Sequence, residues 1–237
     1  MSRHSQVLFL SVLTILLIVF NSLIIRRGLL NNNYLDTYKK PENKNFTIHI
    51  EVDKKVLHLI DSSNHKIIKD YNIATGKTSS PTPLGTFFIV EKGRWGEGFG
   101  SRWIGLNIPW GKYGIHGTNR PSSIGANVSG GCVRMRNSDV EDLYDRVGIG
   151  SAVVITNGYY GPFGNGLRNL RPGDRGADVL EVQKRLKILG YYDSALDGIY
   201  GESMKKSLIK FLKDKNIPLT DEISGNIYEK LGIILMD

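Results

Sequence analysis

The hydrophobic period of this chain changes once, and that change constrains the fold more than any other feature. In residues 46–52, Phe46, Ile48 and Ile50 alternate with polar residues, and a period of two indicates a half-buried strand. From residue 170 onward, apolar residues recur every three or four positions, as on an amphipathic helix. We therefore expect a mainly β domain followed by a small all-α domain.

The boundaries follow from the same patterns. The β domain is predicted over residues 46–156, with one short helix that begins at Ser138-Asp139. Residues 157–169 are rich in Gly and Asn, which favours a linker. Residues 170–235 carry three predicted helices, and Gly190 stops the first of them. The other predicted strands cover residues 56–60, 67–68, 71–74, 85–90, 103–108 and 151–156.

The amino-terminal region predicts a membrane anchor. Residues 7–25 contain no charge, and 19 apolar-rich residues are enough to cross a hydrocarbon core of ~30 Å as a helix. A cleaved signal peptide has a shorter apolar core and a small-residue cleavage site. We therefore expect a signal anchor over residues 1–27 and a polar stalk over residues 28–45. A buried core helix is the alternative for residues 7–25. The positive-inside rule, applied to Arg26 and Arg27, would keep the carboxy-terminal side of the anchor in the cytoplasm.

One cysteine is present, which excludes an internal disulfide and a Cys-cluster zinc site. Two glycines precede Cys132, so the backbone can approach a substrate and offer N–H groups to an oxyanion. Arg134 and Arg136 follow, and positive charge favours a thiolate. His116 lies sixteen residues upstream among glycines typical of a loop, and it is the candidate base for a cysteine nucleophile. A small buried thiol that packs as a hydrophobe is the alternative.

Three separated segments resemble one enzyme family. The segments are PTPLGTF at residues 81–87, GIHGT at 114–118 and SGGCVRM at 129–135, and they occur in the order seen in L,D-transpeptidases of the YkuD type. Residues 147–155, VGIGSAVVI, resemble the closing strand of that family. The resemblance covers residues 46–156 and implies a YkuD-like β-sandwich with a short helix.

The resemblance also implies roles for individual residues. Cys132 would be the nucleophile, His116 the general base and acid, and the backbone carbonyl of Gly117 would orient the imidazole. Backbone N–H groups of Gly130, Gly131 and Cys132 would bind the oxyanion, although Gly130 stands where the family usually has a histidine. Arg134 would either shape the substrate pocket, where it could hold a substrate carboxylate, or have a structural role.

The helical region resembles a peptidoglycan-binding domain of the three-helix kind. Ser203 and Leu212 replace the threonine and glutamine common in that family, and a helical dimerisation appendage is the alternative. The segments that carry the resemblance are LRPGDRGADV at residues 170–179, VQKRL at 182–186, LGYY at 189–192, DGIYG at 197–201 and FL at 211–212.

The expected function is acyl transfer on peptidoglycan stem peptides through a Cys132 thioester, which gives 3→3 cross-links in cell wall biogenesis. An L,D-carboxypeptidase that uses the same residues, or a catalytically decayed wall-binding protein, are the alternatives. The expected partners are stem peptides, glycan and, through the anchor, the membrane, with both domains extracytoplasmic and facing the wall. The sequence does not specify an oligomeric state.

No cofactor and no metal are expected. His49, His58 and His65 lack the close spacing of metal ligands in a sequence motif, so ordinary surface or core histidines are predicted. The net charge of +8 could suggest nucleic acid, but no recognition helix or aromatic ladder accompanies it. Anionic wall polymers or a membrane surface explain the charge equally well.

Overall fold

The computed structural model describes residues 45–94 and 96–235. The predicted anchor, and all but the last residue of the predicted stalk, lie outside these residues. Within the two described ranges, no helix is long and apolar enough to cross a membrane.

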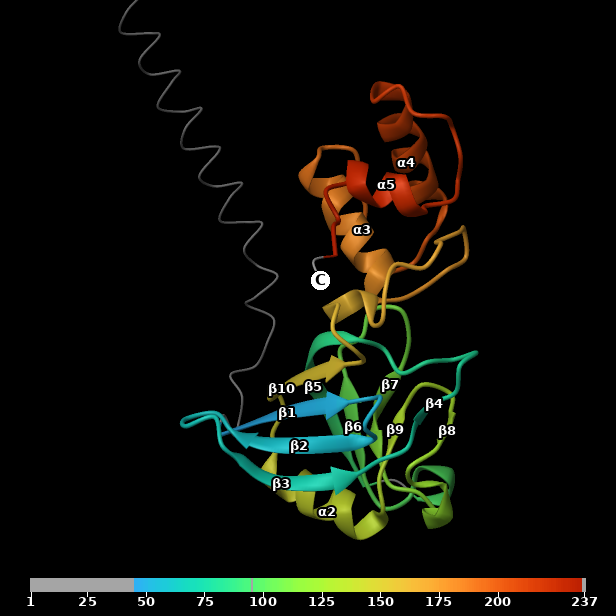
Figure 1. Cartoon of the computed structure of the whole chain (residues 1–237). Coiled ribbons are helices and arrows are strands. Elements are labelled where there is room, and N and C mark those ends of the chain that lie inside the picture. The colour runs from blue at the N-terminus through green and yellow to red at the C-terminus, as the bar shows by residue number, and fades with distance from the viewer. Residues whose placement is uncertain (1–44, 95, 236–237) are drawn as a thin grey trace, which may run out of the picture. The chain divides into compact units, whose positions relative to one another are not determined.

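The β region is built on one curled sheet rather than on two separate layers. Eight strands pair in the order β3-β2-β1-β10-β5-β6-β7-β9, and β4 pairs with β8 in a small second sheet (Figure 1). The strands are β1 (Phe46–Glu51), β2 (Val56–Asp61), β3 (Ile67–Asn72), β4 (Thr75–Gly76), β5 (Gly85–Gly93), β6 (Trp103–Leu106), β7 (Tyr113–His116), β8 (Asn127–Ser129), β9 (Val133–Arg134) and β10 (Ala152–Thr156).

Alternation along the longer strands places one face of the sheet in the core. Ile48 and Ile50 of β1 are fully buried, and so is Leu59 of β2, which stands opposite Ile48 in the antiparallel register. Ile50 pairs with Ile155 of β10 in a parallel register. The sequence period of two therefore predicted the buried face correctly. The short strands β4, β7, β8 and β9 were not predicted, because two to four residues are too few to show a period.

The short helix predicted in the β region is present as α2 (Asn137–Arg146). Its apolar residues Val140 and Leu143 are fully buried in the core of the sheet. The carboxylate of Asp142 accepts hydrogen bonds from Tyr71 Oη at 2.7 Å and from Lys69 Nζ at 2.9 Å, and so ties α2 to β3. Single turns of 3₁₀-helix occur at η2 (Glu97–Phe99), η3 (Pro121–Ser123) and η4 (Gly161–Phe163).

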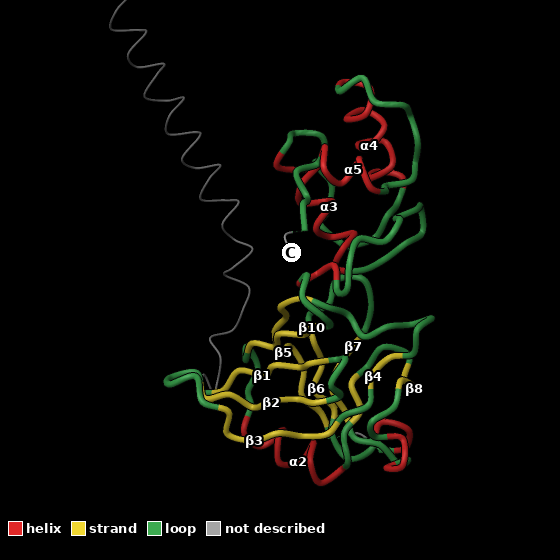
Figure 2. Tube along the Cα trace, viewed as in Figure 1, coloured by secondary structure: helices red, strands yellow, loops and turns green. Residues whose placement is uncertain are grey.

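The carboxy-terminal region forms three helices around its own core, α3 (Ala177–Ile188), α4 (Glu202–Asp214) and α5 (Gly225–Lys230) (Figure 2). Gly190 follows the end of α3 with a φ of 81°, a left-handed conformation that glycine adopts without strain. Leu212 is fully buried, so this apolar replacement belongs to the core and not to a binding face. The buried side chains of this core are Leu170, Val179, Val182, Leu186, Tyr192, Tyr200, Met204, Leu208, Phe211, Leu212, Ile223, Ile227, Tyr228, Leu231 and Ile233.

Candidate active site

Parallel pairing of β7 with β9 brings the segments that carry the two candidate catalytic residues side by side. His116 stands opposite Arg134, and Ile115 stands opposite Val133. Cys132 comes two residues before Arg134, so in an extended chain both side chains lie on the same face as His116. Cys132 and His116 therefore lie on adjacent segments, and the thiol is in reach of the backbone N–H of Gly114 in β7, although sixteen residues separate Cys132 from His116 in the sequence.

His116 is the last residue of β7 and is 3% exposed, so the predicted loop is a strand at this point. Its Nδ1 lies 2.6 Å from the carbonyl oxygen of Gly117. A carbonyl can only accept, so Nδ1 carries the proton and Nε2 is the basic nitrogen of the neutral ring. The contact that the family resemblance implies is thus present in the fold.

Two aromatic rings hold the imidazole in place. Trp103, which stands opposite His116 in the antiparallel β6–β7 pair, stacks on it with ring centroids 5.9 Å apart and planes inclined by 30°. Phe99 meets the same ring edge-on at 5.1 Å. These contacts restrict rotation of the imidazole and exclude water from most of its surface.

The ring is neutral in the resting protein. Burial lowers the pKa of His116, and the charge of Arg134 lowers it further, against the carbonyls of Gly117 and Phe99, which act to raise it. The net shift is downward from the ordinary value of 6.5. A histidine with a lowered pKa is unprotonated at pH 7 and can accept a proton from a thiol.

Cys132 carries a neutral thiol in the resting state. Burial raises its pKa, and the backbone N–H of Gly114 and the charge of Arg134 lower it without offsetting the burial. Arg136 is exposed before α2 and is not among the groups that shift this pKa. The expected effect of positive charge on the thiol is therefore present for Arg134 and absent for Arg136, and burial outweighs it. A neutral thiol beside a neutral imidazole requires proton transfer during attack.

Ser129 fixes the loop that precedes the thiol. Its hydroxyl is buried, donates to the carbonyl of Cys132 at 2.6 Å and accepts from the N–H of Gly131 at 3.1 Å. Because that N–H is already bonded, the three predicted oxyanion donors reduce to two. Within the described residues, the N–H groups of Gly130 and Cys132 form no hydrogen bond.

The two glycines before the thiol have different reasons to be glycine. Gly131 has a φ of 115°, and a Cβ added to it would lie 2.6 Å from Cε1 of Tyr113. Gly130 is exposed, and a Cβ there would meet no heavy atom within 4 Å. Position 130, where the family usually has a histidine, therefore has open space for a side chain.

Gly117 is also held by a close approach. A Cβ at this position would lie 2.2 Å from Oδ1 of Asn137, which already accepts a hydrogen bond from the N–H of Ser101 at 3.2 Å. The start of α2 and the segment around residue 100 therefore fix the backbone whose carbonyl orients His116. Sequence reasoning missed this role of Asn137, because only the fold brings α2 to the end of β7.

Arg134 is half-buried, and its charge acts on both His116 and Cys132. Its Nε is buried and has no hydrogen-bond partner among the residues that the structure describes. A buried guanidinium N–H without an acceptor is rare, because its desolvation is not compensated. Sequence reasoning did not assign roles to Ser129, Phe99 and Trp103. Ser129 lies within a motif that the sequence displays, whereas Phe99 and Trp103 contact His116 only because the chain folds.

Comparison with known proteins identifies the family. The model of the L,D-transpeptidase catalytic domain, YkuD, matches residues 46–155. The "Putative L,D-transpeptidase YkuD" of Bacillus subtilis strain 168 is 42% identical over 116 residues, which are 48% of this chain and 70% of that protein. The chain belongs to the L,D-transpeptidase family. The "Putative L,D-transpeptidase YqjB" of the same organism is 36% identical over 125 residues, which are 46% of this chain and 71% of that protein.

The second domain of this chain also has a match. The model described as "Putative peptidoglycan binding domain" covers residues 175–231, which include all three carboxy-terminal helices. Among solved structures, the catalytic domain of the Enterococcus faecium L,D-transpeptidase is 20% identical and aligns with 48% of this chain and 98% of that one. Its TM-score of 0.41 is too low to support an argument about this chain.

Proposed function

We propose that this L,D-transpeptidase joins peptidoglycan stem peptides through a thioester on Cys132. The observation that carries the proposal is the pairing of β7 with β9, because β7 ends in His116 and Cys132 comes directly before β9. The hydrogen bond from His116 Nδ1 to the Gly117 carbonyl then directs the basic Nε2 away from that carbonyl. A nucleophile, a base and a group that orients the base are the parts that covalent acyl transfer requires.

The first half-reaction begins with neutral partners. Nε2 of His116 takes the thiol proton while Sγ of Cys132 attacks the carbonyl that precedes the terminal D-residue of a tetrapeptide stem. The N–H groups of Gly130 and Cys132 are the donors for the tetrahedral oxyanion, and one such donor contributes on the order of 3 kcal/mol. The imidazolium then protonates the departing amine, the C–N bond breaks, and a thioester and free D-alanine result.

The second half-reaction reverses these proton movements. An amine on a neighbouring stem attacks the thioester, and His116 accepts the proton of that amine. The C–S bond breaks, the proton returns to Sγ of Cys132, and a 3→3 cross-link is formed. The unpartnered Nε of Arg134 supports a role for this side chain in holding a carboxylate of the substrate.

The other regions of the chain support the same reading. The match over residues 175–231 supports a domain that binds peptidoglycan, which would keep the catalytic domain near its substrate. Residues 7–25 would anchor the chain in the cell membrane, with both domains outside and facing the wall. In intact protoplasts, protease should then cut within residues 157–169; protection of this segment would contradict the topology.

The decisive experiment uses the full chain in detergent with labelled disaccharide-tetrapeptide. We expect a cross-linked dimer together with one free D-alanine per link, and neither product from Cys132→Ala. Tripeptide without dimer would refute the transferase and indicate an L,D-carboxypeptidase. Neither product, together with no covalent adduct of Cys132 on incubation with a carbapenem, would indicate a decayed site.

A further inference from the structure

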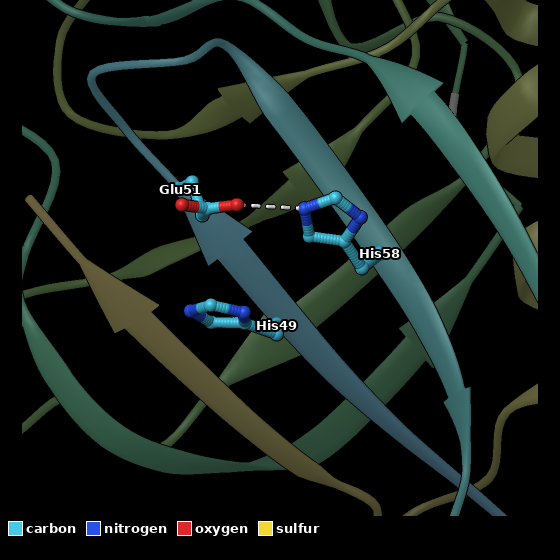
Figure 3. A group of neighbouring side chains, drawn as sticks. All are labelled: His49, Glu51 and His58. Atoms are coloured by element: carbon cyan, nitrogen blue, oxygen red, sulfur yellow. Dashed lines mark hydrogen bonds and ion pairs between the residues drawn. The ribbon is translucent and has the colours of Figure 1, made fainter. Parts of the chain in front are cut away.

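A cluster of ligand-type side chains lies on the outer face of the β1–β2 hairpin, away from the catalytic residues. His49 and Glu51 are two residues apart on β1, so they share the face opposite the buried Ile48 and Ile50. His58 of β2 stands directly opposite His49 in the antiparallel register. Figure 3 shows the three side chains turned toward one another.

The three side chains are close enough to share one ion. One ligand atom from each of His49, Glu51 and His58 lies within 4.8 Å of the other two. Nε2 of His58 is 2.9 Å from Oε1 of Glu51. The side chains of His58 and Glu51 are only 13% and 20% exposed, so the cluster is partly shielded from water.

Neighbouring side chains orient both imidazoles. Oδ1 of Asp70, opposite His58 in the β2–β3 register, lies 2.7 Å from Nδ1 of His58. Nε2 of His49 lies 3.0 Å from Oγ1 of Thr156, which leaves Nδ1 of that ring for a ligand. A carboxylate that holds the far nitrogen of a histidine is the usual outer partner of a metal ligand, because it fixes the ring and raises its basicity.

This arrangement requires a positive species between His58 and Glu51. If Nδ1 of His58 donates to Asp70, the lone pair of Nε2 in a neutral ring faces the Glu51 carboxylate, and the two repel. A proton on Nε2 resolves the conflict. A cation bound in place of that proton resolves the conflict equally well.

We propose that His49, Glu51 and His58 form a binding site for a divalent cation of the zinc type, with Nδ1 of His49, Nε2 of His58 and Oε1 of Glu51 as ligands and water in the fourth position. Two imidazoles and one carboxylate suit Zn²⁺ and its neighbours, whereas Ca²⁺ and Mg²⁺ prefer oxygen ligands. Lys54 binds the other oxygen, Oε2 of Glu51, at 2.7 Å, and its side chain is 64% exposed and free to turn toward water when a cation binds.

The test is a Zn²⁺ titration of the full chain in competition with a chromophoric chelator. The titration is run on Cys132→Ser, because a cysteine thiolate binds zinc and would add a competing site. We expect one Zn²⁺ per chain and, with Co²⁺, the visible bands of a tetrahedral nitrogen and oxygen site. His49→Ala and His58→Ala should each weaken binding by at least about tenfold, and Asp70→Asn by about 10- to 100-fold.

His65→Ala is the matched control, because His65 is an exposed histidine of the β2–β3 turn. It should leave the zinc affinity unchanged. Melting curves recorded without metal show whether each variant folds, and His58→Gln replaces His58→Ala if the latter does not. No binding to Cys132→Ser, or binding that His49→Ala and the folded His58 variant leave unaltered, would overturn the proposal.

Discussion

The two glycines before the catalytic thiol provide a sharp test of the site, because the same substitution at neighbouring positions should have opposite results. Gly131→Ala places a residue with a Cβ at a φ of 115°, which costs about 1–3 kcal/mol in backbone strain. The new Cβ would also lie 2.6 Å from Cε1 of Tyr113 and 3.2 Å from the carbonyl of Pro81. Overpacking of this kind adds about 1–3 kcal/mol, so we expect a loss of about 2–6 kcal/mol in unfolding free energy.

Gly130→Ala is the control. No heavy atom lies within 4 Å of the new Cβ, so stability should change by no more than about 0.5 kcal/mol and rates by about twofold. Cys132 is the only cysteine, so alkylation by iodoacetamide reports on this thiol alone. For Gly131→Ala we expect a melting temperature lower by about 4–24 °C and, because the backbone of the thiol shifts, carbapenem acylation slower by about 100-fold.

The comparison is made on the full chain, with thermal unfolding, alkylation kinetics and the mass of the carbapenem adduct measured for both variants. Equal melting temperatures and equal acylation rates for Gly131→Ala and Gly130→Ala would refute the reasoning. In that case, neither the left-handed backbone nor the contact with Tyr113 would hold the thiol in place.

Three other predictions concern the same domain. Arg134→Gln should raise the pKa values of both His116 and Cys132, because the charge of Arg134 lowers both. The acid limb of the pH profile of kcat/KM and the pH midpoint of Cys132 alkylation should therefore both move to higher pH. Movement of the two in opposite directions would contradict this prediction. Ser129→Ala leaves the carbonyl of Cys132 and a buried N–H without their partner, which should reduce the unfolding free energy by about 1–3 kcal/mol in urea titrations, and an unchanged midpoint would exclude the predicted role. Burial acts to raise the pKa of Asp142, but hydrogen bonds from its neighbours outweigh burial and lower this pKa from 3.8 to about 2. The carboxylate therefore stabilises the fold above pH 3.8, and this contribution is lost as the pH falls toward 2. Asp142→Asn should have a free energy of unfolding lower by about 2 kcal/mol at pH 7, and the difference from the unmodified protein should be gone near pH 2.

The candidate site could be predicted from the sequence only as far as its residue types and order allowed. Cys132, His116 and Gly117 lie in recognisable motifs. The number of residues between them, however, does not tell how far apart they lie in the folded protein. The pairing of His116 with Arg134 follows from a two-residue strand, β9, which shows no period in the sequence. The ionisation of Cys132 depends on burial, which raises its pKa, whereas the motif shows only Arg134, whose charge lowers that pKa.

The same limit applies to the outer face of the hairpin. The spacing of His49, Glu51 and His58 shows no pattern typical of a metal-binding motif. The register of β1 and β2 places His49 opposite His58, and the alternation of side chains turns Glu51 to the same face. A register shift of one residue would have pointed His58 into the core.

The sequence alone determined the order of the two domains, the buried face of the long strands, the three carboxy-terminal helices and the one cysteine that can be proposed as a nucleophile. These features depend on local period and on residue type, which can be read along the chain. The tertiary structure alone decided that burial outweighs the charge of Arg134 at Cys132, that Gly131 is constrained while Gly130 has open space, and that His49, Glu51 and His58 lie within reach of one another. Each of these depends on strand pairing and on the exclusion of water, which arise only when distant segments pack together.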